Sequence, residues 1–346
     1  MTVLRAHEGV AHGPGSRTLP RTVAVVGAAG HQGKEYLDAV GEIDGVSVVG
    51  VVDPARAAVP TGHRRFDSTA QMLAEVVPDV AIVAVPHAHH VDVTLELLAA
   101  GCHVLKEKPL ATTVAAANAL VDAARRADRG IVTLTQRPYQ PLFHELARAV
   151  GAIGDPYWLA YTYAMSFERP TQGWRSVAAL AHGGVLLDMG YHVIDVLQRM
   201  FGDSEVLAAR RHYRYGASRR ERLEDLVSAK LSMRDGSLTA DVTIARHAHT
   251  REESVVVHGT HGVATVDVRR GELVVYDRSG KVMSQFSGKA SNDRAGRAEM
   301  LAQMMGSVVD PERAGRDMEM HVMNVRTCDA VYQACRHRPR ARTSIV

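Results

Sequence analysis

A short apolar run that ends on glycine and leads into a helical pattern is the feature that most limits how this chain can fold. The run Thr-Val-Ala-Val-Val occupies residues 22–26, glycines follow at Gly27, Gly30 and Gly33, and residues 34–40 have helical periodicity. This order predicts a strand, a glycine turn and a helix. Glycines let the backbone approach a pyrophosphate, and a helix N-terminus offers it free N–H groups. The segment therefore predicts a dinucleotide site.

The second apolar run strengthens this interpretation, because the glycine spacing is G-x-x-G-x-x-G and not the commoner G-x-G-x-x-G. Residues 46–52 are followed by Asp53. It lies 20 residues after Gly33, at a position where an acidic side chain can accept hydrogen bonds from an adenosine ribose. Such an aspartate slightly favours NAD, whereas Arg56 could meet the 2′-phosphate of NADP. Both cofactors stay open, and a simple turn after the strand is the alternative interpretation.

Apolar strands and helical segments alternate as far as residue 135, and this alternation predicts a doubly wound parallel sheet of the α/β class. A chain of 346 residues is long for one core, so two domains are expected. We expect a flexible tail at residues 1–20 and a dinucleotide-binding domain at residues 21–140. Further strands are predicted at 79–85, 102–107 and 131–135, and helices at 69–76, 89–100 and 113–128.

After Pro138 the pattern changes to successive strands with short turns, which predicts an antiparallel sheet. A second domain of mixed α and β structure is expected over residues 141–346. Its helices are predicted at 142–150, 183–201, 294–309 and 316–335, and its strands at 157–167, 225–233, 237–246, 254–258, 263–268 and 272–276.

Two charged clusters follow predicted strands of the first domain. Lys108 comes directly after the strand at 102–107, at the sheet edge where ligands bind in open α/β folds, although a solvated surface turn is the alternative. His87, His89 and His90 follow the strand at 79–85. Their spacing lacks the i, i+4 pair that places two ligands on one helix face, so no metal is predicted. We expect these histidines to line the cofactor crevice.

A third cluster lies in the predicted helix at 183–201. Asp188 and His192 are four residues apart, so they share one helix face about a turn apart. A carboxylate can orient an imidazole and stabilise its charged form, and histidine passes protons near neutral pH. A purely structural hydrogen-bonded pair is the alternative.

Composition excludes several classes of partner. The net charge is +3, and no basic cluster interleaved with aromatic residues suggests a nucleic-acid partner. Three cysteines are too few and too scattered for a disulfide framework or a zinc site, and they fit a reducing cytoplasm. No segment has the character of a secretory signal, and no window approaches the roughly 18 apolar residues of a membrane span.

Taken in order, the motifs resemble those of the glucose-fructose oxidoreductase / inositol dehydrogenase (Gfo/Idh/MocA) family. They are the glycine turn, Glu107-Lys108-Pro109, and the sequence Gly-Gly-Val-Leu-Leu-Asp-Met-Gly-Tyr-His-Val-Ile-Asp at residues 183–195. Residues 100–105 and the pair Trp174-Arg175 also match the family pattern. The resemblance covers residues 21 to about 340.

This resemblance implies an NAD(P)-dependent oxidoreductase that acts on a CH–OH group of a sugar, cyclitol or related polyol. It implies a Rossmann domain, and a substrate-binding α+β domain whose large, mostly antiparallel sheet pairs subunits into a homodimer or homotetramer. By the family pattern, Lys108 contacts the reacting substrate oxygen, His192 is the acid or base, and Asp188 assists. The cofactor-binding residues expected are Gly27, Ala29, Gly30, His31, Gln32, Gly33, Asp53, Arg56, Pro86, His87, His90, Glu107, Lys108, Gln136, Trp174 and Arg175.

Two departures from the family are the glycine spacing and Lys106, where a small or apolar residue is usual. Lys106 and Lys108 share a face of an extended strand. We hypothesise that Lys106 either makes Lys108 easier to deprotonate, through like-charge repulsion, or meets a phosphate. Substrate selectivity is expected from the second domain, around Tyr161, Tyr163 and Arg169.

Two other functions stay open. One is an NAD-dependent glycoside hydrolase, because some relatives retain the nicotinamide and use transient oxidation to eliminate and add water. The other is a regulatory protein that binds NAD(P) without chemistry. The joint presence of Lys108, Asp188 and His192 argues against the second of these.

Overall fold

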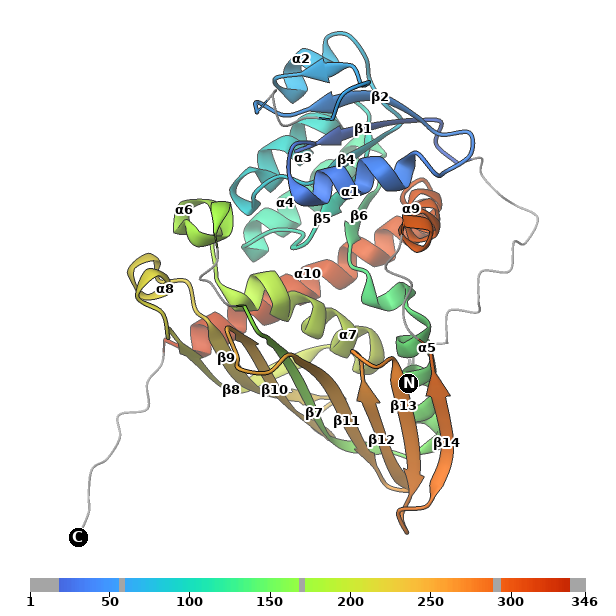
Figure 1. Ribbon diagram of the computed structural model, residues 1–346, viewed down its shortest axis with the longest axis vertical. Coiled ribbons are helices and arrows are strands. Elements are labelled where there is room, and N and C mark those ends of the chain that lie inside the picture. The colour runs from blue at the N-terminus through green and yellow to red at the C-terminus, as the bar shows by residue number, and fades with distance from the viewer. Residues whose placement is uncertain (1–18, 56–59, 168–171, 289–293, 337–346) are drawn as a thin grey trace.

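The computed structural model describes residues 19–55, 60–167, 172–288 and 294–336, and it contains two β-sheets with helices packed on them (Figure 1). The tail predicted at residues 1–20 lies almost wholly outside the described residues. Arg56 and Arg169 lie outside them as well. Within the described residues, no helix is long and apolar enough to cross a membrane.

The first sheet is wholly parallel, as the alternating pattern predicts. Its strand order is β3-β2-β1-β4-β5-β6, and the order reverses direction beside β1. A ligand crevice is expected at such a reversal, at the carboxyl ends of the strands. The strands are β1 (Thr22–Val26), β2 (Ser47–Val52), β3 (Arg65–Phe66), β4 (Val80–Val83), β5 (His103–Glu107) and β6 (Ile131–Leu134).

Helices cover both faces of this sheet, which explains why its central strands β1 and β4 are almost wholly apolar. In β1, Ala24 and Val26 pack on the side of α3 and α4, whereas Val23 and Val25 pack on the side of α1 and α9. Thr113 begins α4, and its side chain accepts a hydrogen bond from the Ala116 amide. The helices are α1 (His31–Val40), α2 (Thr69–Leu73), α3 (His90–Ala99), α4 (Val114–Ala127) and α9 (Arg294–Val308).

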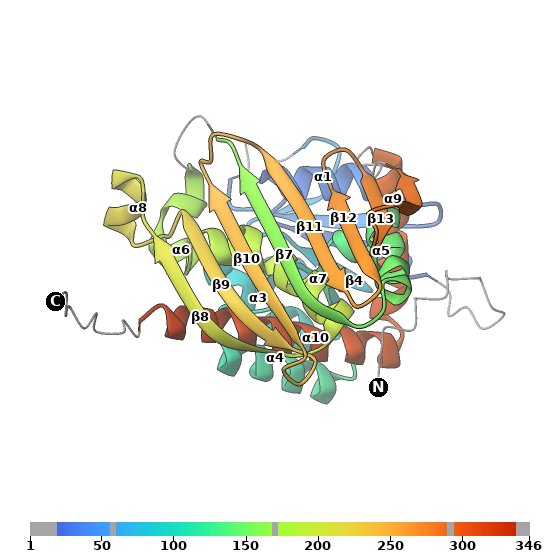
Figure 2. The same cartoon turned by 90° about the horizontal axis from the view of Figure 1, so that it is seen from below.

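The second sheet has the order β14-β13-β12-β11-β7-β10-β9-β8, and all neighbours are antiparallel except β7 and β10. One face packs on α7 and α10, and Figure 2 shows the opposite face with no helix in front of it. The prediction of a mostly antiparallel sheet is confirmed. The strands are β7 (Pro156–Met165), β8 (Ser204–His212), β9 (Leu226–Met233), β10 (Leu238–Arg246), β11 (Glu252–Gly259), β12 (Gly262–Asp267), β13 (Glu272–Asp277) and β14 (Val282–Ser287).

The helix predicted at 183–201 differs from the structure. It begins with a π-helical turn at Leu186–Gly190 and becomes α-helical only in α7 (Tyr191–Phe201). A Cβ at Gly190 would lie 2.6 Å from Cδ1 of Ile244, so this turn approaches β10 closely. The remaining helices are α5 (Pro141–Ala152), α6 (Ala178–Ala181), α8 (Gly216–Glu221) and α10 (Pro311–Ala334), with short 3₁₀ turns at His87–His89, Arg137–Tyr139 and Gly173–Ser176.

The C-terminal helices join the two sheets. Helix α9 packs on the first sheet, through Leu301, Met304 and Met305. Helix α10 lies between the two sheets (Figure 1), and its Asp317 accepts a hydrogen bond of 2.9 Å from the amide of Thr133 in β6. The predicted domain boundary between residues 140 and 141 stays a prediction. The structure adds that the C-terminal helices return to the first sheet.

Candidate active site

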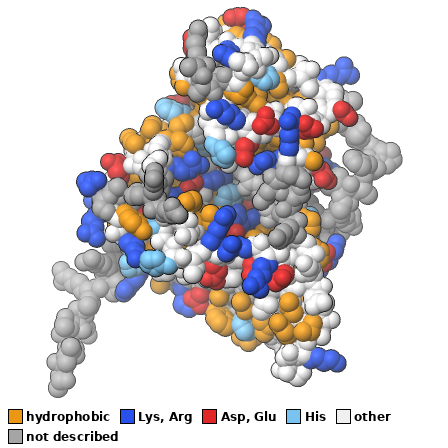
Figure 3. Space-filling view, in the orientation of Figure 1, with side chains coloured by type: hydrophobic (Ala, Val, Ile, Leu, Met, Phe, Trp, Pro, Cys, Tyr) orange, Lys and Arg blue, Asp and Glu red, His pale blue; other side chains and the backbone are white. Residues whose placement is uncertain are grey.

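A cavity of about 400 Å³ lies between the two domains, beyond the carboxyl ends of β4 and β5. On the face of the molecule seen in Figure 1, Lys, Arg and His side chains gather in the middle (Figure 3). The first domain contributes His31, Gln32, Val85, His87, His90, Glu107 and Lys108, and the second contributes Phe167, Gln172, Trp174, Arg175, Asp188 and Arg246.

The glycine turn beside this cavity is tightly packed. Gly27 has a φ of +87°, and a Cβ on it would lie 2.4 Å from the carbonyl oxygen of Ala84. A Cβ on Gly33 would lie 2.2 Å from the carbonyl oxygen of Gly27. Gly30 is exposed and caps α1 without a side chain, which leaves the first N–H groups of the helix open. This is the arrangement that a pyrophosphate needs.

Asp53 holds the glycine turn in place. Its carboxylate accepts a hydrogen bond of 3.0 Å from the Ala29 amide and one of 2.8 Å from the Ala55 amide. The side chain stands after β2, at the carboxyl edge of the sheet where an adenosine ribose would bind. Recognition of the ribose stays a prediction.

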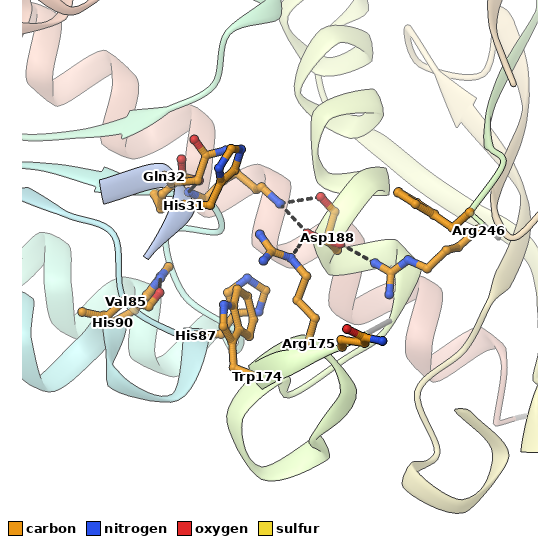
Figure 4. A pocket seen from close by; sticks show the side chains of 13 residues that line it. His31, Gln32, Val85, His87, His90, Trp174, Arg175, Asp188 and Arg246 are labelled. Atoms are coloured by element: carbon orange, nitrogen blue, oxygen red, sulfur yellow. Dashed lines mark hydrogen bonds and ion pairs between the residues drawn. The ribbon is translucent and has the colours of Figure 1, made fainter. Parts of the chain in front are cut away.

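Lys108 follows β5 and donates its side-chain protons to Asp188. Its Nζ lies 3.0 Å from Oδ1 of Asp188 and also donates to the backbone carbonyl of that residue. The same carboxylate accepts from Nε of Arg175 at 3.2 Å and from a terminal nitrogen of Arg246 (Figure 4). Three cations from three separate segments therefore converge on one carboxylate.

This arrangement keeps Asp188 ionised. Burial alone would raise the pKa of Asp188, but Lys108, Arg246 and Arg175 outweigh burial and hold it far below its usual range. A carboxylate with so low a pKa is a poor proton acceptor at neutral pH. Its chemical contribution is to orient Lys108 and to balance its charge.

His192 is placed differently from the sequence interpretation. Among the described residues its Nδ1 has no hydrogen-bond partner, and the Asp188 oxygens bond to the three cations instead. The interpretation that Asp188 orients the imidazole by a direct hydrogen bond is therefore wrong. The π-helical turn is the physical reason, because it breaks the regular i, i+4 stacking between these positions.

The imidazole of His192 is held in its neutral form. Burial lowers the pKa of His192 well below its usual value, and Arg137 and Lys108 lower it further. The ring is therefore neutral at physiological pH. His192 does not line the cavity as the structure stands, although Lys108 is close enough to act on its charge.

Of the three histidines expected in the crevice, His87 and His90 line the cavity, whereas His89 is exposed and does not, and His87 also joins the two domains. Nδ1 of His87 lies 2.7 Å from the carbonyl oxygen of Ala181 in α6, and its ring meets Trp174 edge-on at 4.7 Å. Burial, with help from Lys108, lowers the pKa of His87 to about 3, so this ring is neutral. In the described part of the chain, no group of three His, Cys, Asp or Glu side chains could hold a metal ion.

Lys106 and Glu107 are the last two residues of β5, so their side chains point to opposite faces of the sheet. Glu107 accepts a hydrogen bond from the hydroxyl of Tyr36, and burial raises its pKa although Lys108 opposes this. Lys106 is completely buried, and its ammonium contacts backbone carbonyls. The hypothesis that Lys106 meets a phosphate is therefore wrong, because no phosphate can reach a side chain with no exposed surface.

Two residues that sequence reasoning missed set the position of Asp188. Glu224 is buried and accepts hydrogen bonds of 3.1 Å from the amides of Gly184 and Leu186, so it caps the start of the π-helical turn. Arg246 ends β10 and binds the carboxylate itself. Neither gives a local signal, because each acts on a segment far away in the sequence.

Of the predicted site residues, eight from the cofactor set line the cavity together with Asp188. The predicted residues that do not line it are Gly27, Ala29, Gly30, Gly33, Asp53, Pro86, Gln136 and His192, and Arg56 is outside the described residues.

The sheet order, the glycine turn at its reversal point and the lysine crevice closed by a second sheet define a two-domain dinucleotide-binding protein. Comparison with known families agrees. Residues 21–134 match the oxidoreductase family with an NAD-binding Rossmann fold, and residues 146–265 match the C-terminal domain of the same family. The chain belongs to the GFO/IDH/MocA family.

Curated relatives align mainly over half of the chain. A 1,5-anhydro-D-fructose reductase of Ensifer adhaerens is 33% identical over 190 residues, which is 53% of this chain and 55% of that protein. A D-apiose dehydrogenase of Paraburkholderia graminis is 27% identical over 203 residues, which is 56% of this chain and 53% of that protein. The chain thus spans about half the length of the curated relatives it matches.

Solved structures share the fold over almost the whole chain. A 3-ketoreductase from Actinomadura kijaniata has a TM-score of 0.78 at 22% identity and covers 91% of this chain and 98% of that one. An aldose-aldose oxidoreductase from Caulobacter crescentus has a TM-score of 0.76 at 20% identity, with coverages of 92% and 98%. At such identities these likenesses establish the fold.

Proposed function

We propose that this protein is an NAD(P)-dependent oxidoreductase that converts a CH–OH group of a sugar, cyclitol or related polyol to the ketone, or the reverse. The observation that carries the proposal is Lys108, which stands at the carboxyl end of β5 in the crevice with its Nζ 3.0 Å from the Asp188 carboxylate. Family membership and the names of the relatives, which include dehydrogenases and reductases of sugars, support it.

The cofactor fits the residues that are present. The glycine turn leaves no space for a Cβ at Gly27 or Gly33, and the uncapped start of α1 offers its N–H groups to a pyrophosphate. His31, Gln32, Trp174 and the other residues of the predicted set would hold the remainder. Asp53 slightly favours NAD, and the choice between NAD and NADP is part of the test below.

The chain's own residues supply the proton chemistry. When bound, nicotinamide supplies or accepts the hydride at the carbinol carbon. The ammonium of Lys108 then stabilises negative charge that develops on the substrate oxygen. His192, whose lowered pKa keeps it neutral, takes up the hydroxyl proton or returns it in the opposite direction. Asp188 keeps Lys108 aimed at the oxygen.

We also propose that the subunits pair through the open face of the second sheet, as a homodimer or homotetramer in the cytoplasm. That face exposes Tyr157, Trp158 and Leu207 by 53%, 39% and 52%. Large exposed apolar side chains on one face are typical of an interaction surface. The free thiols of Cys102, Cys328 and Cys335 suit a reducing compartment. Light scattering of the purified protein measures the oligomeric state.

The experiment that tests the activity is a panel of sugars and polyols with NAD and NADP, and of the matching ketoses with NADH and NADPH. Absorbance at the nicotinamide band reports net hydride transfer. Turnover with one substrate class supports the proposal. Release of sugar from a glycoside without net reduction would favour the hydrolase, and no turnover with bound cofactor would favour the regulator.

A further inference from the structure

Lys106 is a fully buried lysine to which the proposed chemistry gives no role. Its side chain has no exposed surface, and it lies in β5 opposite Val83 on one side and Thr133 on the other. Its Nζ lies 2.9 Å from the carbonyl oxygen of Pro109, 2.6 Å from that of Leu110 and 3.1 Å from Nδ1 of His90. The two carbonyl oxygens can only accept, so Lys106 donates a hydrogen bond to each of them.

His90 has a carbonyl contact on each ring nitrogen. Nε2 lies 3.0 Å from the carbonyl oxygen of Val85, and Nδ1 lies 3.2 Å from the carbonyl oxygen of Pro109, which Lys106 also contacts. Burial, and then Lys106 itself, holds the pKa of His90 well below its usual range, so the ring stays neutral. Lys106 can donate to both loop carbonyls whichever nitrogen of His90 carries the proton.

These bonds hold the loop that carries Lys108. Pro109 and Leu110 directly follow Lys108, and Lys106 binds the carbonyls of both. From the other side, the amide of Leu110 donates to the hydroxyl of Tyr191 at 3.3 Å, and Tyr191 precedes His192. Lys106 therefore holds the loop from one side, and Tyr191 attaches it to α7 from the other.

We propose that Lys106 is a positioning residue: its side chain fixes residues 108–110 so that Lys108 stays within hydrogen-bond distance of Asp188 and close to His192. The inference rests on the proposed function only for its kinetic readout. Among the described residues, the titratable groups that act on the pKa of Lys106 or His90 include His87, from the segment after β4, and Glu107, the next residue of β5, and the Tyr191 hydroxyl faces the same loop from α7.

The structural arm of the test is hydrogen–deuterium exchange on the full chain. Lys106→Met should speed exchange in peptides that cover residues 103–111 and leave the other peptides unchanged. The matched control is Lys281→Met, at an exposed lysine between β13 and β14, which should change nothing in that loop. Unchanged exchange at residues 103–111, or faster exchange everywhere, overturns the proposal, because a purely structural lysine would act on the whole fold.

The kinetic arm uses the best substrate of the panel. Lys106→Met should lower kcat about 10- to 100-fold, since a loop displaced by about 1 Å misplaces the reacting group. The Kd for NAD(P) should change less than about twofold, because Lys106 does not line the cavity. Lys106→Gln, which keeps a donor without a buried charge, replaces the methionine variant in both arms if that variant does not fold. Wild-type kcat in a folded variant overturns the proposal, and failure of the panel itself leaves the exchange arm to decide.

Discussion

Replacing Asp188 with asparagine isolates the electrostatic part of the site. Asp188→Asn removes the charge that Lys108, Arg175 and Arg246 share, while the size of the side chain is kept. The Asp188 side chain is only 18% exposed, so water can replace little of the lost interaction. Breaking a buried charge pair costs about 3–5 kcal/mol, and the asparagine oxygen still accepts one hydrogen bond, so we expect about 3 kcal/mol.

The pH dependence gives this prediction a second signature. The folded-state pKa of Asp188 is depressed, so its stabilisation is present above the unfolded pKa of about 4 and is lost only as pH falls through the folded value. The difference between wild type and Asp188→Asn should therefore be the same at pH 7 and pH 5, and it should shrink only in stronger acid.

Urea unfolding followed by circular dichroism measures the difference. At a slope of roughly 3 kcal/mol per molar urea, a loss of about 3 kcal/mol lowers the midpoint by about 1 M. Glu312→Gln is the control, because the pair Glu312–Arg316 lies on the surface, with side-chain exposures of 82% and 59%, and should contribute at most about 1 kcal/mol. Equal urea midpoints for Asp188→Asn and Glu312→Gln would refute the stabilising role of the ion pairs at Asp188.

Two further predictions concern Lys106 and the glycine turn. Burial lowers the pKa of Lys106 to about 7, so between about pH 7 and pH 10 the unfolded chain binds more protons than the folded one at this group. The wild type should therefore gain roughly 2–3 kcal/mol of stability relative to Lys106→Met as pH rises from 7 to 9, and parallel urea midpoints at both pH values would contradict this. Gly33→Ala places a Cβ 2.2 Å from the Gly27 carbonyl and should weaken NAD(P) binding at least about tenfold, because the turn must shift. Gly151→Ala in α5 meets nothing within 4 Å and should leave binding unchanged and raise stability by about 0.5–1 kcal/mol, so calorimetric titration of both variants checks the turn.

The first sheet was predictable because its signals are local. The run at residues 22–26 is apolar and buried at every position after Thr22, since both faces of β1 are covered, and Gly33 is required by its contact with Gly27 in the same turn. Strand β3 (Arg65–Phe66) was missed because two residues cannot show a period. Most other boundaries differ from the prediction by a few residues.

The site was only partly predictable because its geometry depends on contacts between distant segments. The π-helical turn depends on Glu224 and on the contact between Gly190 and Ile244, neither of which a helical pattern reveals. The sequence pattern predicts that Lys106 can reach a ligand, because a charged residue in a strand is usually exposed to water. Its actual partners include His90, which lies 16 residues earlier and reaches it only in the folded sheet.

The central claim is that Lys108 and His192 act on the substrate oxygen and its proton. Steady-state turnover of Lys108→Ala and His192→Ala, measured beside NAD(P) affinity on the same preparations, tests it most directly. Each variant should lose about 100-fold or more in kcat, the magnitude typical of removing a proton-transfer group, with cofactor binding nearly intact. Wild-type turnover in either variant would contradict the role given to that residue.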